Sequence, residues 1–168
     1  MNIDIVAVNV TVLALVFVPY ILFLYVGQQD FRKINYEFKK EARKHALNID
    51  IKGRWNLNAI GIDSHKQKLL FVQRRDEEVF VSLINLSVIQ KCISNHHSEQ
   101  LLVRGENEQV LQNIELELIQ NNNDDKIILS LFNSDINMGQ DYELKHAKKW
   151  TAIINNNLSI NSNLRKVA

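Results

Sequence analysis

The sequence predicts an α+β protein in which a single N-terminal transmembrane helix precedes a small antiparallel β-sheet or open barrel, capped by a C-terminal helix. Three observations carry this prediction: an uncharged apolar run near the start, short apolar runs between turn-forming clusters in the middle, and a helical apolar period near the end. The 168 residues allow one small domain with an appendage. A net charge of +1 and a single cysteine argue against a strongly basic nucleic-acid binder and a disulfide framework.

The uncharged run covers residues 5–26 and predicts a transmembrane helix over residues 1–27. A helix of this length is roughly 33 Å long, enough for a hydrocarbon core of about 30 Å. A cleaved signal peptide is one weaker alternative, because the preceding residues are acidic and no small-residue cleavage site follows. A buried core helix is the other, because 22 uncharged residues exceed the usual length of such a run in a core helix. Asn9 and Thr11 are the polar side chains expected to hydrogen-bond across a helix–helix interface.

Residues 28–48 are predicted to form a basic juxtamembrane helix. Its basic residues are Arg32, Lys33, Lys39, Lys40, Arg43 and Lys44, whereas only Asp4 precedes the apolar run. The positive-inside rule therefore places the N-terminus outside and the rest in the cytoplasm. Heavy use of Asn and Ile is typical of AT-rich bacterial coding, so the predicted location is a bacterial inner membrane.

Phe31, Ile34 and Phe38 recur at helical spacing within this segment, and Ala42 extends their stripe. One interpretation is an interfacial helix in which residues 28–46 contact anionic lipid headgroups through the six basic side chains. The other is a topology signal that continues the transmembrane helix as a stalk. Both interpretations can hold together.

From residue 49 the chain shows short β-like runs. Residues 57–62 and 68–73 predict a hairpin around a turn at 63–67, and residues 79–86 and 88–94 predict two further strands on either side of a corner at 85–87. Residues 96–109 are polar and are expected to be mostly loop. Residues 113–118 alternate between apolar and polar side chains, and a loop at 121–125 joins them to a last strand at 126–132.

A helix is predicted to close this domain. Asp141 is its expected N-cap, and its apolar stripe comprises Leu144, Ala147, either Trp150 or Thr151, Ile154 and Leu158. Residues 49–158 are accordingly assigned to the β domain with its closing helix, and residues 159–168 to a flexible tail.

This order of elements resembles pleckstrin-homology-like (PH-like) domains, particularly membrane-linked bacterial ones. The matching stretches are the hairpin AIGIDSHKQKLLFV, the strand–corner–strand FVSLINLSVIQKCIS and the helix ELKHAKKWTAIINNNL. The resemblance implies a binding module rather than an enzyme. Lipid-binding members carry basic residues in their first hairpin, where this chain has Lys66, Lys68, Arg74 and Arg75. The strand between them, residues 69–72, lacks the interior basic residue of the phosphoinositide-binding pattern, so specific inositide binding is not expected.

No group of residues predicts catalysis, a metal or a cofactor. His96 and His97 are adjacent and have only Glu99 as a nearby carboxylate, so solvated residues are favoured over a metal site. Cys92 is expected to be a small buried apolar residue rather than a nucleophile. Glu115 and Glu117 lie two apart in a strand and are expected to face water rather than act as an acid–base pair.

These features favour a protein that acts through contacts. The leading hypothesis is a non-catalytic accessory or scaffold subunit of an inner-membrane complex, with other integral membrane proteins as partners and no nucleic acid. The alternative is a membrane-tethered sensor that binds anionic lipid headgroups or a soluble ligand.

Overall fold

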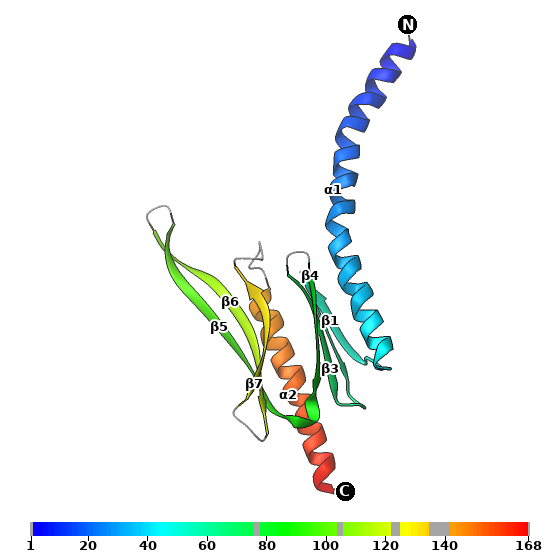
Figure 1. Cartoon of the computed structure of the whole chain (residues 1–168). Coiled ribbons are helices and arrows are strands. Elements are labelled where there is room, and N and C mark those ends of the chain that lie inside the picture. The colour runs from blue at the N-terminus through cyan, green and yellow to red at the C-terminus, as the bar shows by residue number, and fades with distance from the viewer. Residues whose placement is uncertain (1, 76–77, 104–105, 122–124, 135–141, 168) are drawn as a thin grey trace.

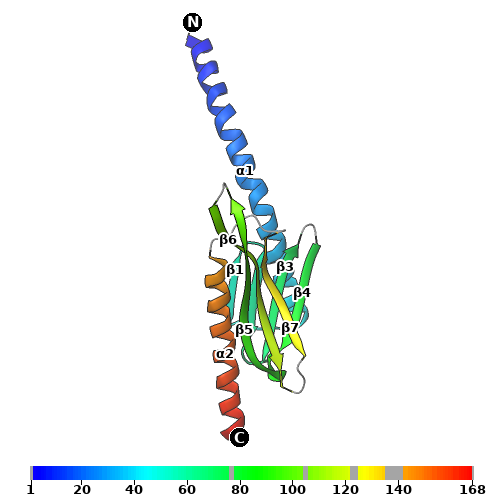
Figure 2. The same ribbon diagram turned by 90° about the vertical axis from the view of Figure 1, so that its left-hand side faces the viewer.

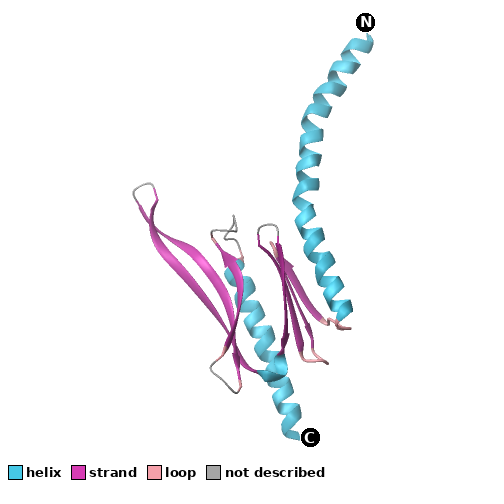
Figure 3. Cartoon of the chain, viewed as in Figure 1, coloured by secondary structure: helices cyan, strands magenta, loops and turns pink. Residues whose placement is uncertain are grey.

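The computed structural model describes residues 2–75, 78–103, 106–121, 125–134 and 142–167. Short apolar runs between turns fold as strands, and the two segments with helical period fold as long helices (Figures 1 and 3). The elements are, in order, α1 (Asn2–Lys44), β1 (Ile51–Trp55), β2 (Asn58–Asp63), β3 (Lys68–Arg75), β4 (Glu78–Asn85), the 3₁₀ turn η1 (Leu86–Val88), β5 (Ile89–Val103), β6 (Glu106–Gln120), β7 (Lys126–Asn133) and α2 (Glu143–Val167).

The strands form two antiparallel sheets. The first has four strands in the order β1-β2-β3-β4, and the second has three in the order β5-β6-β7. Local side chains fix the connections: Asp63 Oδ1 accepts from the Lys66 amide at 2.8 Å in the β2–β3 turn, and Asn85 Oδ1 accepts from the Ser87 amide at 3.2 Å where the chain leaves the first sheet. The chain is thus α+β, but the single sheet or open barrel predicted from the sequence is wrong, because the corner at η1 carries the chain into a separate sheet.

The main core lies between the two sheets and α2. Its largest fully buried side chains come from both sheets and from the helix: Trp150, Phe132, Ile60, Ile62, Leu69, Leu86, Ile114, Leu116, Leu118 and Leu131. Helix α2 runs along one side of the two sheets, next to β1 and β5 (Figures 1 and 2). Trp150 reaches β1, where a Cβ atom on Gly53 would lie only 2.6 Å from its Cζ2 atom. Gly53 therefore lets the indole pack directly on the strand.

A second, smaller core covers the opposite face of the first sheet. Ile34 and Phe38 of α1 are buried there against Ala59, Leu70 and Val72. The order of layers is therefore second sheet, main core with α2, first sheet, and the C-terminal half of α1 (Figure 1).

The predicted transmembrane helix over residues 1–27 is wrong. Within the residues that the structure describes, none of the helices combines the length and the apolar character that crossing a membrane requires. The apolar run belongs to one continuous helix of 43 residues, α1, whose second half carries charges and packs on the β domain.

Three further segments differ from the sequence-based expectation. β1 was not predicted and forms the edge of the first sheet. Residues 96–109, expected as loop, belong to the long β5–β6 hairpin wherever they are described. Helix α2 continues to Val167 through the segment expected as a flexible tail. The expected N-cap, Asp141, lies outside the described residues.

Candidate interaction surface

The C-terminal half of α1 is fixed to the first sheet by close packing. A Cβ atom on Gly61 of β2 would lie 2.7 Å from Phe38 Cζ and 2.7 Å from Ile49 Cγ2. The close contact between the helix and the sheet therefore requires a glycine at this position. At the end of the helix the Lys66 ammonium donates to the Ala46 carbonyl at 2.5 Å, where a cation complements the helix dipole. The stripe containing Phe31, Ile34 and Phe38, for which an interfacial helix and a stalk were both open interpretations, thus packs mainly on the protein's own sheet.

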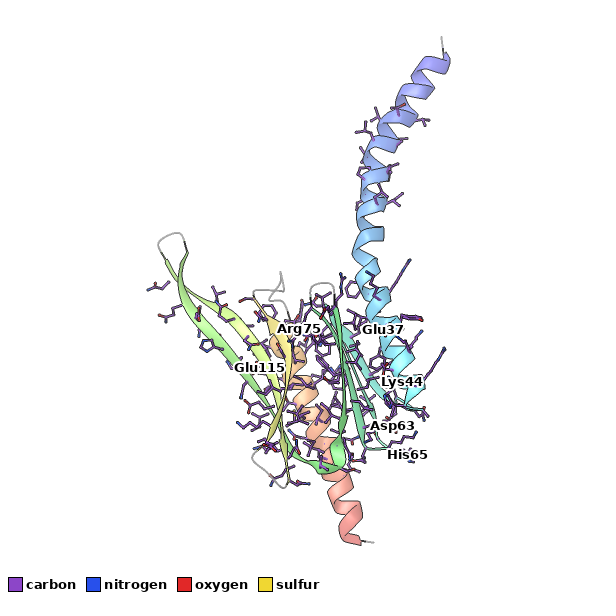
Figure 4. The ribbon with its side chains drawn as sticks, viewed as in Figure 1. Glu37, Lys44, Asp63, His65, Arg75 and Glu115 are labelled. Atoms are coloured by element: carbon purple, nitrogen blue, oxygen red, sulfur yellow. The ribbon has the colours of Figure 1, made fainter. Side chains whose placement is uncertain are left out.

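The six basic residues predicted to contact a membrane surface lie on the exposed sides of this half of α1. All six are exposed: Arg32, Lys33, Lys39, Lys40, Arg43 and Lys44. Two of them pair locally, since Lys40 Nζ lies 2.9 Å from Glu37 Oε2 and Lys44 Nζ lies 3.3 Å from Glu41 Oε2 (Figure 4 labels Glu37 and Lys44). The hydrogen bond and charge of Glu37 raise the pKa of Lys40. Surface pairs of this kind contribute little stability, but they reduce the positive charge available to a partner.

The N-terminal half of α1 extends away from the sheets (Figure 1). Its described side chains, at residues 10–22, are all exposed and almost all apolar. Leu15 is 73% exposed, and Pro19 lies within the same stretch of continuous helix. The other exposed large apolar residues of this segment, which we term the apolar segment (residues 10–22), are Val10, Val12, Leu13, Val16, Phe17, Val18, Tyr20, Ile21 and Leu22. A helix that is apolar all round is normally buried, so this surface is the strongest candidate for contact with something outside the chain.

Of the two residues predicted to support helix–helix packing, Thr11 lies exposed within the apolar segment. The side chain of Asn9 lies outside the described part of the structure, although its backbone belongs to α1.

Buried polar side chains connect the two sheets. Asn58 Nδ2 donates to the Leu131 carbonyl at 2.8 Å, and Gln73 Nε2 donates to the Ser130 carbonyl at 2.7 Å. Asn155 of α2 closes another strand edge, because its amide accepts from Cys92 N at 2.9 Å and donates to Cys92 O at 2.8 Å. These bonds satisfy backbone groups on the outer edges of β7 and β5, which reduces the capacity of both edges to pair with another strand.

A polar cluster lies at the N-terminus of α2. Glu143 is 1% exposed and its carboxylate accepts a hydrogen bond from Asn56, while the Trp55 indole stacks on the His146 ring with 4.8 Å between ring centroids. Burial raises the pKa of Glu143. The pKa of His146 is lowered, mainly by burial and to a smaller extent by the positive charge of Lys149. No sequence signal pointed to this cluster, because its members are far apart in the chain.

The histidines and Cys92 lie where metal or nucleophilic chemistry is not favoured. His96 and His97 are exposed in β5, and His97 Nε2 lies 3.7 Å from Glu99 Oε1. Across the described residues, no three His, Cys, Asp or Glu side chains come together as a metal ion would need. Cys92 is buried, as predicted, and burial raises the pKa of its thiol to about 12.

The two glutamates of β6 take part in pairs with neighbouring residues. Glu117 Oε2 lies 3.1 Å from Lys126 Nζ, and Lys126 lowers the pKa of Glu117. Glu115 Oε1 accepts from Asn113 Nδ2 at 2.8 Å. Each carboxylate therefore has a local partner on the sheet.

The basic residues around the β2–β3 hairpin do not converge on one ligand position. Lys66 binds the end of α1, whereas Arg75 donates to Gln73 Oε1 at 2.6 Å and lies over the Phe80 ring at 5.4 Å. Figure 4 shows Arg75 at the end of the sheet opposite Asp63 and His65, which mark the β2–β3 turn.

Comparison with protein-family models, with curated proteins and with solved structures finds no match to this chain.

Proposed function

We propose that the protein is a non-catalytic accessory or scaffold subunit of a protein assembly at a bacterial inner membrane. The observation that carries the proposal is the apolar segment of α1, whose described large side chains are between half and three-quarters exposed. Burying such a surface releases about 25 cal/mol per Å² of apolar area, so a partner that covers it gains substantial binding free energy.

The way in which α1 is held favours a partner over a loose tail. Its C-terminal half is locked onto the first sheet through Ile34 and Phe38, so the apolar segment projects from a folded base. Apolar helices of integral membrane proteins offer a matching surface, and helix packing with them needs no charged contacts. The order of four strands, three strands and a helix is compatible with the binding role that the sequence resemblance to PH-like domains implies.

Affinity purification of the full-length protein in mild detergents tests this proposal. We expect a partner at fixed stoichiometry, and its loss when Leu15→Lys and Phe17→Lys place charges in the apolar segment. Ile128→Lys is the matched control, because Ile128 is also apolar and 54% exposed but lies on β7. A clean monomer in several detergents, or equal loss with the control, would refute the proposal.

A second candidate function is binding of anionic lipid by residues 28–46, favoured by the exposure of Lys33, Lys39 and Arg43 on the side of α1 away from the sheet. Vesicle pelleting should then depend on anionic lipid and weaken with salt. Lys39→Gln with Arg43→Gln should remove the dependence. Equal pelleting with neutral and anionic vesicles would exclude this function.

A further inference from the structure

A groove of about 320 Å³ lies between α1 and the edge strand β1. Its lining residues are Asn35 and Phe38 from α1, Lys52, Gly53 and Arg54 from β1, and Ala59 from β2. We infer that this groove binds a phosphate group, with Lys52 and Arg54 as its cationic ligands. The inference is separate from the partner-binding function proposed for the apolar segment.

The two cations are placed to act on one anion. Lys52 and Arg54 are two residues apart in β1 and therefore project from the same face of the strand, with Cα atoms roughly 7 Å apart. The Arg54 guanidinium lies 5.3 Å from the centroid of the Phe31 ring of α1. This cation–π contact places the planar group beside the helix. A guanidinium can bind a phosphate with two parallel N–H donors, which a lysine ammonium cannot do.

The electrostatic surroundings leave these charges uncompensated. None of the six lining residues is acidic, and neither Lys52 nor Arg54 forms an ion pair within the described part of the chain. Carboxylates near the ends of the first sheet are used elsewhere: Asp50 Oδ1 accepts from the Ser64 amide at 3.0 Å, and Asp63 Oδ2 accepts from the Asn48 amide at 2.7 Å. Asn35 lines the groove from α1, and its uncharged side-chain amide is of a type that can donate a hydrogen bond.

The groove, at about 320 Å³, lies at the lower end of the size range of small-molecule sites, so it has room for a phosphate and part of the molecule that bears it. A soluble phosphorylated metabolite and a phospholipid headgroup present the same chemistry. Sequence reasoning overlooked this site because β1 itself was not predicted, so Lys52 and Arg54 had no assigned face.

The test measures binding of two probes to the full-length protein in detergent micelles or with vesicles. Inorganic pyrophosphate, followed by calorimetry, represents the soluble source. Vesicles of phosphatidylglycerol and phosphatidylcholine, compared with pure phosphatidylcholine, represent the lipid source. The variants are Lys52→Gln with Arg54→Gln in the groove, Arg54→Lys, which keeps the charge but removes the planar fork, and Lys148→Gln with Lys149→Gln as the matched control on the exposed side of α2.

We expect at least one probe to bind the wild type, with about tenfold or greater weakening in the groove double variant and an intermediate loss for Arg54→Lys. The control should stay within about twofold, since it removes the same net charge at a distant surface. Absence of binding by both probes overturns the inference. Equal weakening in the control also overturns it, as does a loss that follows Lys39→Gln with Arg43→Gln instead, which would assign the anion to the exposed side of α1. All variants change exposed side chains, so an unchanged melting temperature confirms that each remains folded.

Discussion

The substitution Gly61→Ala tests whether α1 is an integral part of the fold. The new methyl group would lie 2.7 Å from Phe38 Cζ and 2.7 Å from Ile49 Cγ2, distances that real Cβ contacts essentially never show. Both neighbours belong to the layer that covers the outer face of the first sheet. Because the sheet is held from its other side by the main core, we expect α1 to give way rather than β2.

The expected cost combines two opposing effects. Inserting a methylene-sized group into a packed interior costs about 1–3 kcal/mol. Replacing glycine inside a strand returns about 0.5–1 kcal/mol through a smaller loss of backbone entropy. The difference between these ranges is about 0–2.5 kcal/mol, and the two contacts of 2.7 Å place this site in its upper part, about 1–2.5 kcal/mol. This corresponds to a fall in melting temperature of about 2–10 °C for a chain of this size.

Thermal unfolding measures the overall effect, and native-state hydrogen exchange over residues 31–44 shows whether it is centred on α1. Gly53→Ala is the matched control, because its methyl group would meet Trp150 at 2.6 Å and should loosen α2 while leaving the exchange of α1 unchanged. Shortening Phe38 to Leu removes the clashing Cζ atom and should make the double variant less destabilised than the sum of its parts. A Gly61→Ala protein with wild-type melting temperature and α1 protection would refute the proposed docking.

Three other predictions concern the interior. Burial raises the pKa of Glu143 above its ordinary 4.5, so the folded state keeps this proton where the unfolded chain loses it, and stability should fall as pH rises from about 4.5 through the raised pKa. Glu143→Gln should flatten that fall in urea titrations at several pH values, and an unchanged slope would count against the assignment. Asn155→Ala should cost about 1–3 kcal/mol by leaving the Cys92 edge unbonded, whereas exposed Asn156→Ala should melt like the wild type; equal melting of both variants would contradict this role. The Cys92 thiol, with a pKa near 12, should react with a thiol reagent only after denaturant is added, and rapid labelling of the native protein would show that it is accessible.

The sequence predicted those elements whose burial imposes a period on the chain. In β6, Ile114, Leu116 and Leu118 were expected on one face, and all three are fully buried. In α2, the stripe through Ala147 and Ile154 was expected to face the core, with either Trp150 or Thr151 at its centre. Trp150 is the one of these two that is buried in the core. A half-buried strand or helix must alternate in this way, so the pattern can be found without tertiary information.

Elements without such a period were missed. β1 consists of Lys52, Gly53 and Arg54 between only two apolar residues, and its strand conformation depends on pairing with β2 and on the close approach of Trp150. The outer part of the β5–β6 hairpin carries polar side chains such as His96 and Glu99 that remain exposed. In both cases the hydrogen bonds to a neighbouring strand decide the conformation, and this contribution is not visible in the side-chain pattern.

The docking of the C-terminal half of α1 on the first sheet was missed for a different physical reason, and it bears directly on function. β3 carries apolar residues at consecutive positions, Leu69 to Val72, and all are buried, which requires cover on both faces of the sheet. The main core covers one face, and Ile34 and Phe38 cover the other. The apolar stripe of α1 was thus complementary to a surface within the same chain, and a membrane was not needed to explain it. Residues 10–22 differ from this docked half, because their apolar side chains stay exposed and no described part of the chain covers them. The free energy of burying that surface is available to a partner, which is why the proposed function rests on this segment and not on the docked half of the helix.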